Sequence, residues 1–138
     1  MRIMAIDYGD AHTGIAISDP TGFLTGFTTT ITAYRPEAVA ERVAALAAEH
    51  GVEELVLGHP RNMDGSLGPR AEKSEDLAGR LRQITGLPVV LWDERRTTVD
   101  AHQILFNAGK NAKKRKKIVD AVAASLILEG YLTYKSTH

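Results

Sequence analysis

The pattern of apolar and polar positions divides the chain into short buried strands and longer amphipathic helices. Ile3–Ile6 is an unbroken apolar run that leads directly into Asp7. An apolar run without alternation is typical of a strand that is buried on both faces, so we expect this strand to lie in the middle of a sheet. Four further strands are predicted, at Ile15–Ile17, about Thr25–Thr32, Glu54–Gly58 and Pro88–Trp92.

Helical spacing of apolar residues occurs between and after these strands. Val39, Val43 and Ala47 repeat at helical spacing behind Pro36, a residue favoured in the first turn of a helix. The predicted helices run from Pro36 to just before Gly51, from about Arg70 to Ile84 with a stop at Gly86, from a cap at Thr97 or Thr98 to about Ala108, and from Ile118 to Tyr134.

The order of these elements predicts a single α/β domain over residues 1–138. The first three strands follow one another directly, which favours an antiparallel meander. Each of the last two strands is entered from a helix, and right-handed crossovers would place both beside the first strand and parallel to it. We therefore expect a five-stranded mixed sheet, with three antiparallel and two parallel strands and with helices on both faces.

Composition narrows the class of protein. The 138 residues are 43% apolar and 25% charged, as in an ordinary soluble globular protein. The chain has no cysteine, which excludes disulfides, thiolate nucleophiles and cysteine zinc sites and suits a cytoplasmic protein. No apolar stretch approaches the roughly 18 residues of a membrane span, and Asp7 interrupts the first one too early for a signal peptide. The net charge of zero argues against a protein that coats nucleic acid indiscriminately.

Several acidic residues follow predicted strands. Functional groups of such sheets gather at the carboxyl ends of the parallel strands. Asp7 and Glu94 fall on this rim, and Asp120 is a third candidate at the start of the last predicted helix. Three carboxylates at close range would repel one another unless a cation lay between them, and hard divalent ions such as Mg²⁺ or Mn²⁺ prefer oxygen ligands. Two such ions, about 4 Å apart, hydrolyse phosphodiester bonds in metal nucleases.

Each of these acids also has a purely structural interpretation. Asp7 could belong to the turn that follows it, and Asp120 could cap its helix. Asp93 and Glu94 stand beside two arginines and could form a surface ion-pair cluster with them. The sequence also leaves open which of these two acids is the second metal ligand. The nuclease hypothesis therefore depends on three distant side chains meeting at one place.

A basic segment precedes Asp120. Six of the nine residues from Gly109 to Lys117 are Lys or Arg. Such a run is usually a solvated loop, but beside a metal site it would attract the phosphates of RNA or branched DNA. The backbone amides of the loop Asn62–Gly68 would add neutral donors. The predicted nucleic-acid contacts are Asn62, Arg95, Arg96, Thr98, Lys110, Lys113, Lys114, Arg115, Lys116 and Lys117.

Four segments, in order along the chain, match the pattern of one family. They are IDYGDAHTGIAISD at Ile6–Asp19, LGHPRNMDGS at Leu57–Ser66, DERRTT at Asp93–Thr98 and VDAVAASLIL at Val119–Leu128. Over essentially its whole length the chain resembles the YqgF family, also called RuvX, of the RNase H-like superfamily, whose members are described as Holliday junction resolvases and as pre-16S rRNA nucleases. The resemblance implies an RNase H-like fold and metal ligands at Asp7, Glu94 and Asp120. It further implies a divalent-metal-dependent nuclease that processes the 5′ end of precursor 16S rRNA, resolves Holliday junctions, or does both.

Some features leave other interpretations open. His59 stands where the family usually has leucine, and it is either a proton donor or a rim residue without a catalytic role. A catalytically silent RNA-binding or ribosome-associated module would have the same fold. An ATPase of the actin or sugar-kinase type is a further alternative, because Asp7, Tyr8 and Gly9 resemble its first phosphate loop, although those proteins build their cleft from two copies of the fold. Junction resolution would likewise call for a symmetric homodimer.

Overall fold

One five-stranded sheet, in the order β3-β2-β1-β4-β5, organises the protein. The computed structural model describes residues 1–93 and 112–137, and the side chains of residues 1–93 and 121–136. The elements in this part of the chain are β1 (Arg2–Asp7), β2 (His12–Ser18), β3 (Thr25–Thr32), α1 (Pro36–His50), β4 (Val52–His59), α2 (Pro69–Thr85), β5 (Val89–Asp93) and α4 (Ala112–Thr137).

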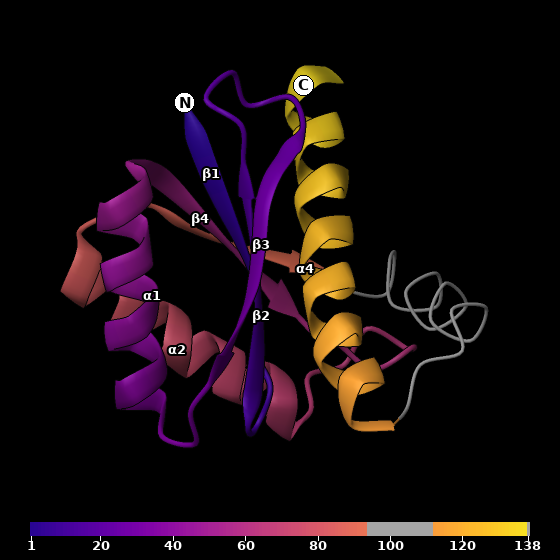
Figure 1. The fold of residues 1–138 in the computed structure, drawn as a ribbon. Helices are drawn as coiled ribbons and strands as arrows, with labels where there is room; N and C mark the ends of the chain where they lie inside the picture. Colours follow the sequence, from indigo (N-terminus) through magenta and orange to yellow (C-terminus); the bar gives the residue numbers. More distant parts are fainter. Residues whose placement is uncertain (94–111, 138) are drawn as a thin grey trace.

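The pairing of the strands confirms the predicted mixed sheet. β1 pairs antiparallel with β2, and β2 pairs antiparallel with β3. β4 lies parallel to β1 on its other side, and β5 lies parallel to β4. The helices cover both faces: α1 and α2 lie on one, and α4 lies on the other (Figure 1). β1 is therefore the central strand, as its unbroken apolar run predicted.

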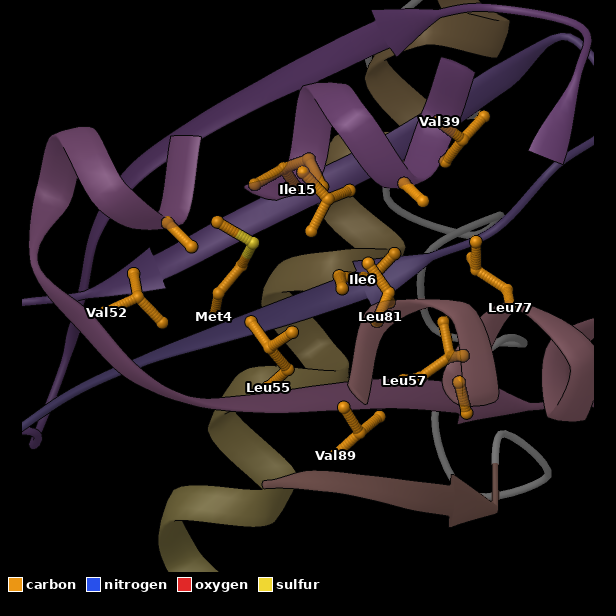
Figure 2. Packing of buried hydrophobic residues seen from close by; sticks show 14 of the residues in the cluster. Met4, Ile6, Ile15, Val39, Val52, Leu55, Leu57, Leu77, Leu81 and Val89 are labelled. Atoms are coloured by element: carbon orange, nitrogen blue, oxygen red, sulfur yellow. The ribbon is translucent and has the colours of Figure 1, made fainter. Parts of the chain in front are cut away.

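Alternate residues of β1 enter two separate hydrophobic clusters, as expected for a strand with a layer of helix on each side. Met4 and Ile6 are fully buried in the larger cluster, beneath α1 and α2 (Figure 2). Ile3 and Ala5 point to the opposite face, where they pack in the smaller cluster with α4. We call these the α1/α2 face and the α4 face.

A stripe of apolar residues attaches α4 to the sheet. Ala124, Ile127 and Leu128 are buried at helical spacing, which places them on one side of the helix. Farther along α4 the Tyr131 ring meets the Trp92 ring of β5 edge to face, with 5.8 Å between the ring centroids. None of the described helices is long and apolar enough to cross a bilayer.

The helix ends show which local signals were reliable and which was not. Gly51 and Gly86 end α1 and α2 in the left-handed conformation, with φ of 66° and 68°, as predicted. The prediction that the basic run is a loop and that the last helix starts at Ile118 is wrong, because α4 already begins at Ala112. Lysine, arginine and alanine all favour helix, and the helix forms here although the positive charges of the lysines and the arginine repel one another. The helix predicted up to Ala108 lies outside the described residues.

Candidate active site at the ends of the central strands

The carboxyl ends of three parallel strands meet at one rim of the sheet, as the order of elements predicted. Ile6 pairs with Leu57, one residue before β1 ends at Asp7. His59, the last residue of β4, pairs with Asp93, the last residue of β5. Asp7 lies beside the end of β4, so this acid and the last residues of β4 and β5 share a single edge.

Asp7 belongs to the α4 face of this rim. It follows Ile3 and Ala5 in the alternation of β1, and both of these residues pack against α4. Among the described residues its carboxylate has no hydrogen bond and no ion pair. The interpretation of Asp7 as a residue that stabilises the following turn therefore has no contact to support it in the described part of the chain.

Glycine occupies the position next to Asp7 on both neighbouring strands. Gly14 of β2 is its pairing partner. On β4, Gly58 follows Leu57, the partner of Ile6, and both of these glycines are buried. Paired residues of adjacent strands project to the same face, so no side chain of either neighbouring strand stands beside the Asp7 carboxylate. On the α4 face, the two neighbouring strands therefore place only backbone next to this acid.

The backbone of α4 carries Asp120 toward the same end of the molecule. Position 120 lies one helical turn before Ala124 and two turns before Leu128, which places it on the same side of the helix as these two residues. In Figure 1, α4 begins in orange at the end of the molecule where the β1–β2 turn lies. Because the helix starts at Ala112, position 120 lies inside it, and the interpretation of Asp120 as a cap is wrong.

The other predicted site residues are described only in part. Asp93 follows Val89 and Leu91 in alternation, which places it on the α1/α2 face, opposite Asp7. Lys113, Lys114, Arg115, Lys116 and Lys117 have their backbone in the first turns of α4. Glu94, Arg95, Arg96, Thr98 and Lys110 lie outside the described residues. Among the side chains that are described, no three metal-binding groups gather in one place.

The loop from β4 to α2 satisfies its polar groups internally. The Asn62 amide N–H donates to the Ser66 carbonyl at 3.0 Å, and the Gly65 N–H donates to the Asn62 carbonyl at 2.8 Å. The Ser66 N–H donates to the Asp64 carboxylate at 2.9 Å. The Asn62 side-chain amide donates to the Ser66 hydroxyl at 3.0 Å. These three backbone amides are therefore already used within the loop, and the prediction that amides of Asn62–Gly68 bind phosphate is limited to the remaining ones.

His59 forms a contact network that the sequence did not predict. The residue is 3% exposed and, like Leu57, lies on the α1/α2 face. The Arg61 Nε–H donates to His59 Nδ1 at 3.2 Å, and Nε2 lies 3.4 Å from the Glu75 carboxylate of α2. His59 thus links the loop to α2 on the face opposite Asp7. This position is unsuitable for a proton donor to a reaction at Asp7.

Ion pairs fix the β1–β2 turn to the first turns of α2. The Arg70 guanidinium reaches the Tyr8 carbonyl at 3.5 Å and the Asp10 carboxylate at 3.7 Å. Lys73 Nζ lies 3.5 Å from the same carboxylate. These charges are exposed, so the pairs contribute little to stability.

The sequence as a whole matches a known family. The sequence model of RuvX, described as "Holliday junction resolvase", matches residues 1–134. The chain belongs to the RuvX family. A relative from Halothermothrix orenii, named "Putative pre-16S rRNA nuclease", is 47% identical over 136 residues, which cover 99% of this chain and 97% of the relative. The family that the four sequence segments indicated is confirmed.

Solved structures confirm the RNase H-like fold of this RuvX-family chain. RuvC of T. thermophilus, in complex with a Holliday junction substrate, aligns with a TM-score of 0.65 and 12% identity, covering 99% of this chain and 96% of RuvC. The ROK hexokinase from Thermus thermophilus aligns with a TM-score of 0.52 and 22% identity, covering 75% of this chain but only 38% of the kinase. The same fold therefore occurs in a resolvase of similar length and in part of a larger kinase.

Proposed function

We propose that this RuvX-family protein is a divalent-metal-dependent nuclease that hydrolyses phosphodiester bonds in structured nucleic acid. Asp7, Glu94 and Asp120 are its proposed catalytic residues and the ligands of Mg²⁺ or Mn²⁺, in a site for two ions. The main support is the position of Asp7, a carboxylate without a partner in the described part of the chain, at the end of the central strand and between two glycines. Family membership supplies the reaction class.

The described surroundings of Asp7 fit a hard divalent ion. The proposed ligands are all carboxylates, and Mg²⁺ prefers oxygen ligands together with water and phosphate. Gly14 and Gly58 put no side chain beside Asp7 that would compete with an ion or a scissile phosphate. When bound, such ions activate a water molecule and stabilise the leaving oxygen. The role of the protein is to hold the carboxylates in position and to orient the phosphate.

The alternation of β5 favours Glu94 over Asp93 as the second ligand. Asp93 lies on the α1/α2 face, where it cannot join Asp7 on the other side of the sheet. Asp120 is on the same side of α4 as Ala124 and Leu128, and this supports its role as the third ligand. A comparison of Asp93→Asn with Glu94→Gln tests the assignment, because only the second substitution should abolish cleavage.

Precursor 16S rRNA is the substrate that we propose first, with processing at its 5′ end in the cytoplasm. The name of the 47% identical relative from Halothermothrix orenii includes this substrate. A Holliday junction is the second candidate, because the family description names it, and its symmetric cleavage would need a homodimer. The proposed contacts are to the phosphate backbone, from the basic start of α4, from Arg95, Arg96 and Thr98, and from Asn62.

A cleavage panel tests the proposed function. The substrates are precursor rRNA ends, single-stranded RNA and a synthetic four-way junction, each with Mg²⁺ or Mn²⁺. We expect Asp7→Asn to lower cleavage at least about a thousandfold while binding stays within about twofold, because a ligand is lost but no phosphate contact is. The exposed Glu41→Gln on α1 is the control and should cleave normally.

The same panel separates the alternative functions. Cleavage that survives in Asp7→Asn would show the metal mechanism to be wrong. Wild-type protein that binds RNA but cuts no substrate with either metal would identify a silent RNA-binding module. ATP turnover without nucleic acid would favour the kinase-like function, although the chain spans only one of the two copies of the fold that this function requires.

A further inference from the structure

A groove opens on the α1/α2 face of the rim, on the opposite side of the sheet from Asp7. Its cavity volume is about 670 Å³. Three segments that are distant in sequence form it: the β1–β2 turn, the approach to α1 and the first turns of α2. The lining residues are Tyr8, Asp10, Tyr34, Pro36, Pro69, Glu72, Lys73 and Asp76.

Aromatic rings and prolines form the apolar walls of this groove. Tyr34 is 76% exposed, and its side chain has no hydrogen bond or ring contact among the described residues. Tyr8 is partly buried, and its ring packs against the larger hydrophobic cluster. Pro36 and Pro69, each in the first turn of a helix, add rigid surface. Flat surfaces of this kind accept an extended peptide segment, as other aromatic-lined grooves do.

The charged residues of the groove leave one carboxylate available. Asp10 is paired with Arg70 and Lys73, and Asp76 is paired with Arg80 at 2.9 Å. The Glu72 carboxylate has no hydrogen bond or ion pair in the described part of the chain, and its side chain is exposed.

The charges around the groove are nearly balanced. Arg70, Lys73 and Arg80 offset the charges of Asp10 and Asp76, so Glu72 is the described lining carboxylate that is left to attract a cation.

We propose that this groove binds an extended, arginine-containing segment of a partner protein. A guanidinium group can stack on an exposed tyrosine ring and donate two hydrogen bonds to the oxygens of one carboxylate. The exposed ring of Tyr34 and the exposed carboxylate of Glu72 line the same groove and offer both contacts. A nucleic-acid backbone would meet the repulsion of Glu72, and a purely apolar segment would bury Glu72 without a partner. The groove and Asp7 occupy opposite faces, so the partner would leave the α4 face open. The inference does not depend on the nuclease reaction.

Backbone amide NMR of the full chain tests this proposal. The probe is a nine-residue peptide with three arginines separated by alanine and serine, and its twin carries citrulline, the neutral isostere, in place of each arginine. We expect the arginine peptide to shift amide signals of the β1–β2 turn, of Tyr34 and of the first turn of α2, and the citrulline peptide to shift them little. A single-stranded RNA of nine nucleotides, without metal, is the third probe.

Two exposed substitutions and their matched controls make the test specific. We expect Glu72→Gln and Tyr34→Ala each to weaken binding of the arginine peptide about two- to fivefold, the range of a single exposed charge or cation–π contact. Glu49→Gln and Phe23→Ala, at exposed positions of α1 and of the β2–β3 turn, should not change it. Equal binding of the citrulline peptide, shifts outside the groove or no binding would overturn the proposal. Shifts at the groove with RNA but not with peptide would identify a nucleobase as the occupant instead and would overturn it equally.

Discussion

Leu128→Ala and Leu77→Ala are a matched pair of substitutions, one on each face of the sheet. Comparing them separates the effect of helix packing on stability from its effect on the reaction. Both leucines are 0% exposed. Leu128 belongs to α4 and the smaller hydrophobic cluster, whereas Leu77 belongs to α2 and the larger one. Of these two helices, only α4 carries a proposed catalytic residue, Asp120, which lies two turns before Leu128. Loosening of α4 should therefore affect catalysis, while loosening of α2 should affect stability alone.

The expected loss of stability is similar for the two substitutions. Truncation of a fully buried leucine removes its transfer free energy and leaves a cavity, which together cost about 3 kcal/mol. For 138 residues the entropy of unfolding is about 0.29 kcal/mol per kelvin, so each melting temperature should fall by about 10 °C. A domain with the usual stability of about 5–15 kcal/mol would remain folded after this loss.

Circular dichroism melts and single-turnover cleavage, measured well below both melting temperatures, provide the two readouts. We expect Leu77→Ala to cleave at the wild-type rate and Leu128→Ala to cleave about ten- to a hundredfold more slowly, because a displacement of about 1 Å at a catalytic group has effects of this size. If both variants melt about 10 °C lower but cleave equally fast, the docking of α4 does not position a catalytic group, and the reasoning is refuted.

Two further predictions concern local structure. Gly79 lies inside α2, and no atom lies within 4 Å of a Cβ added there. Gly79→Ala should therefore raise the free energy of unfolding by about 0.5–1 kcal/mol and the melting temperature by about 2–3 °C. A lower melting temperature would contradict this prediction. The pKa of Asp19 is held below its ordinary value of 3.8, first by the Thr21 hydroxyl and then by backbone amides of the β2–β3 turn. The contribution of Asp19 to stability is thus present above pH 3.8 and is lost as the pH falls through the folded-state pKa. In an NMR titration Thr21→Ala should move the Asp19 midpoint upward, and an unchanged midpoint would show that the hydroxyl has no such role.

Short-range signals in the sequence predicted most of the fold. The apolar run before Asp7 placed the central strand, and the glycines at 51 and 86 ended two helices as expected. The threonine-rich strand was predicted with the bounds that the structure has, Thr25–Thr32. The start of α4 was wrong because a run of lysines was read by its charge alone, although the same residues favour helix.

The candidate site was predictable where it depends on strand order and unpredictable where it depends on packing. The topology alone brings the ends of β1, β4 and β5 together, so the rim could be inferred. The contact between His59 and Glu75 requires the position of α2 above β4, which no local pattern encodes. The groove at Tyr34 similarly combines three segments whose meeting depends on how both helices pack.

The single helix on the α4 face has a consequence for the order in which the molecule is made. Among the described elements only α4 covers that face, and it is synthesised after all five strands. A nascent chain that already pairs β1 with β4 therefore presents Ile3, Ala5 and Val56 to water until residues 112–137 leave the ribosome. Stalled or truncated translation products would be the form of this protein most prone to aggregate and most in need of chaperones.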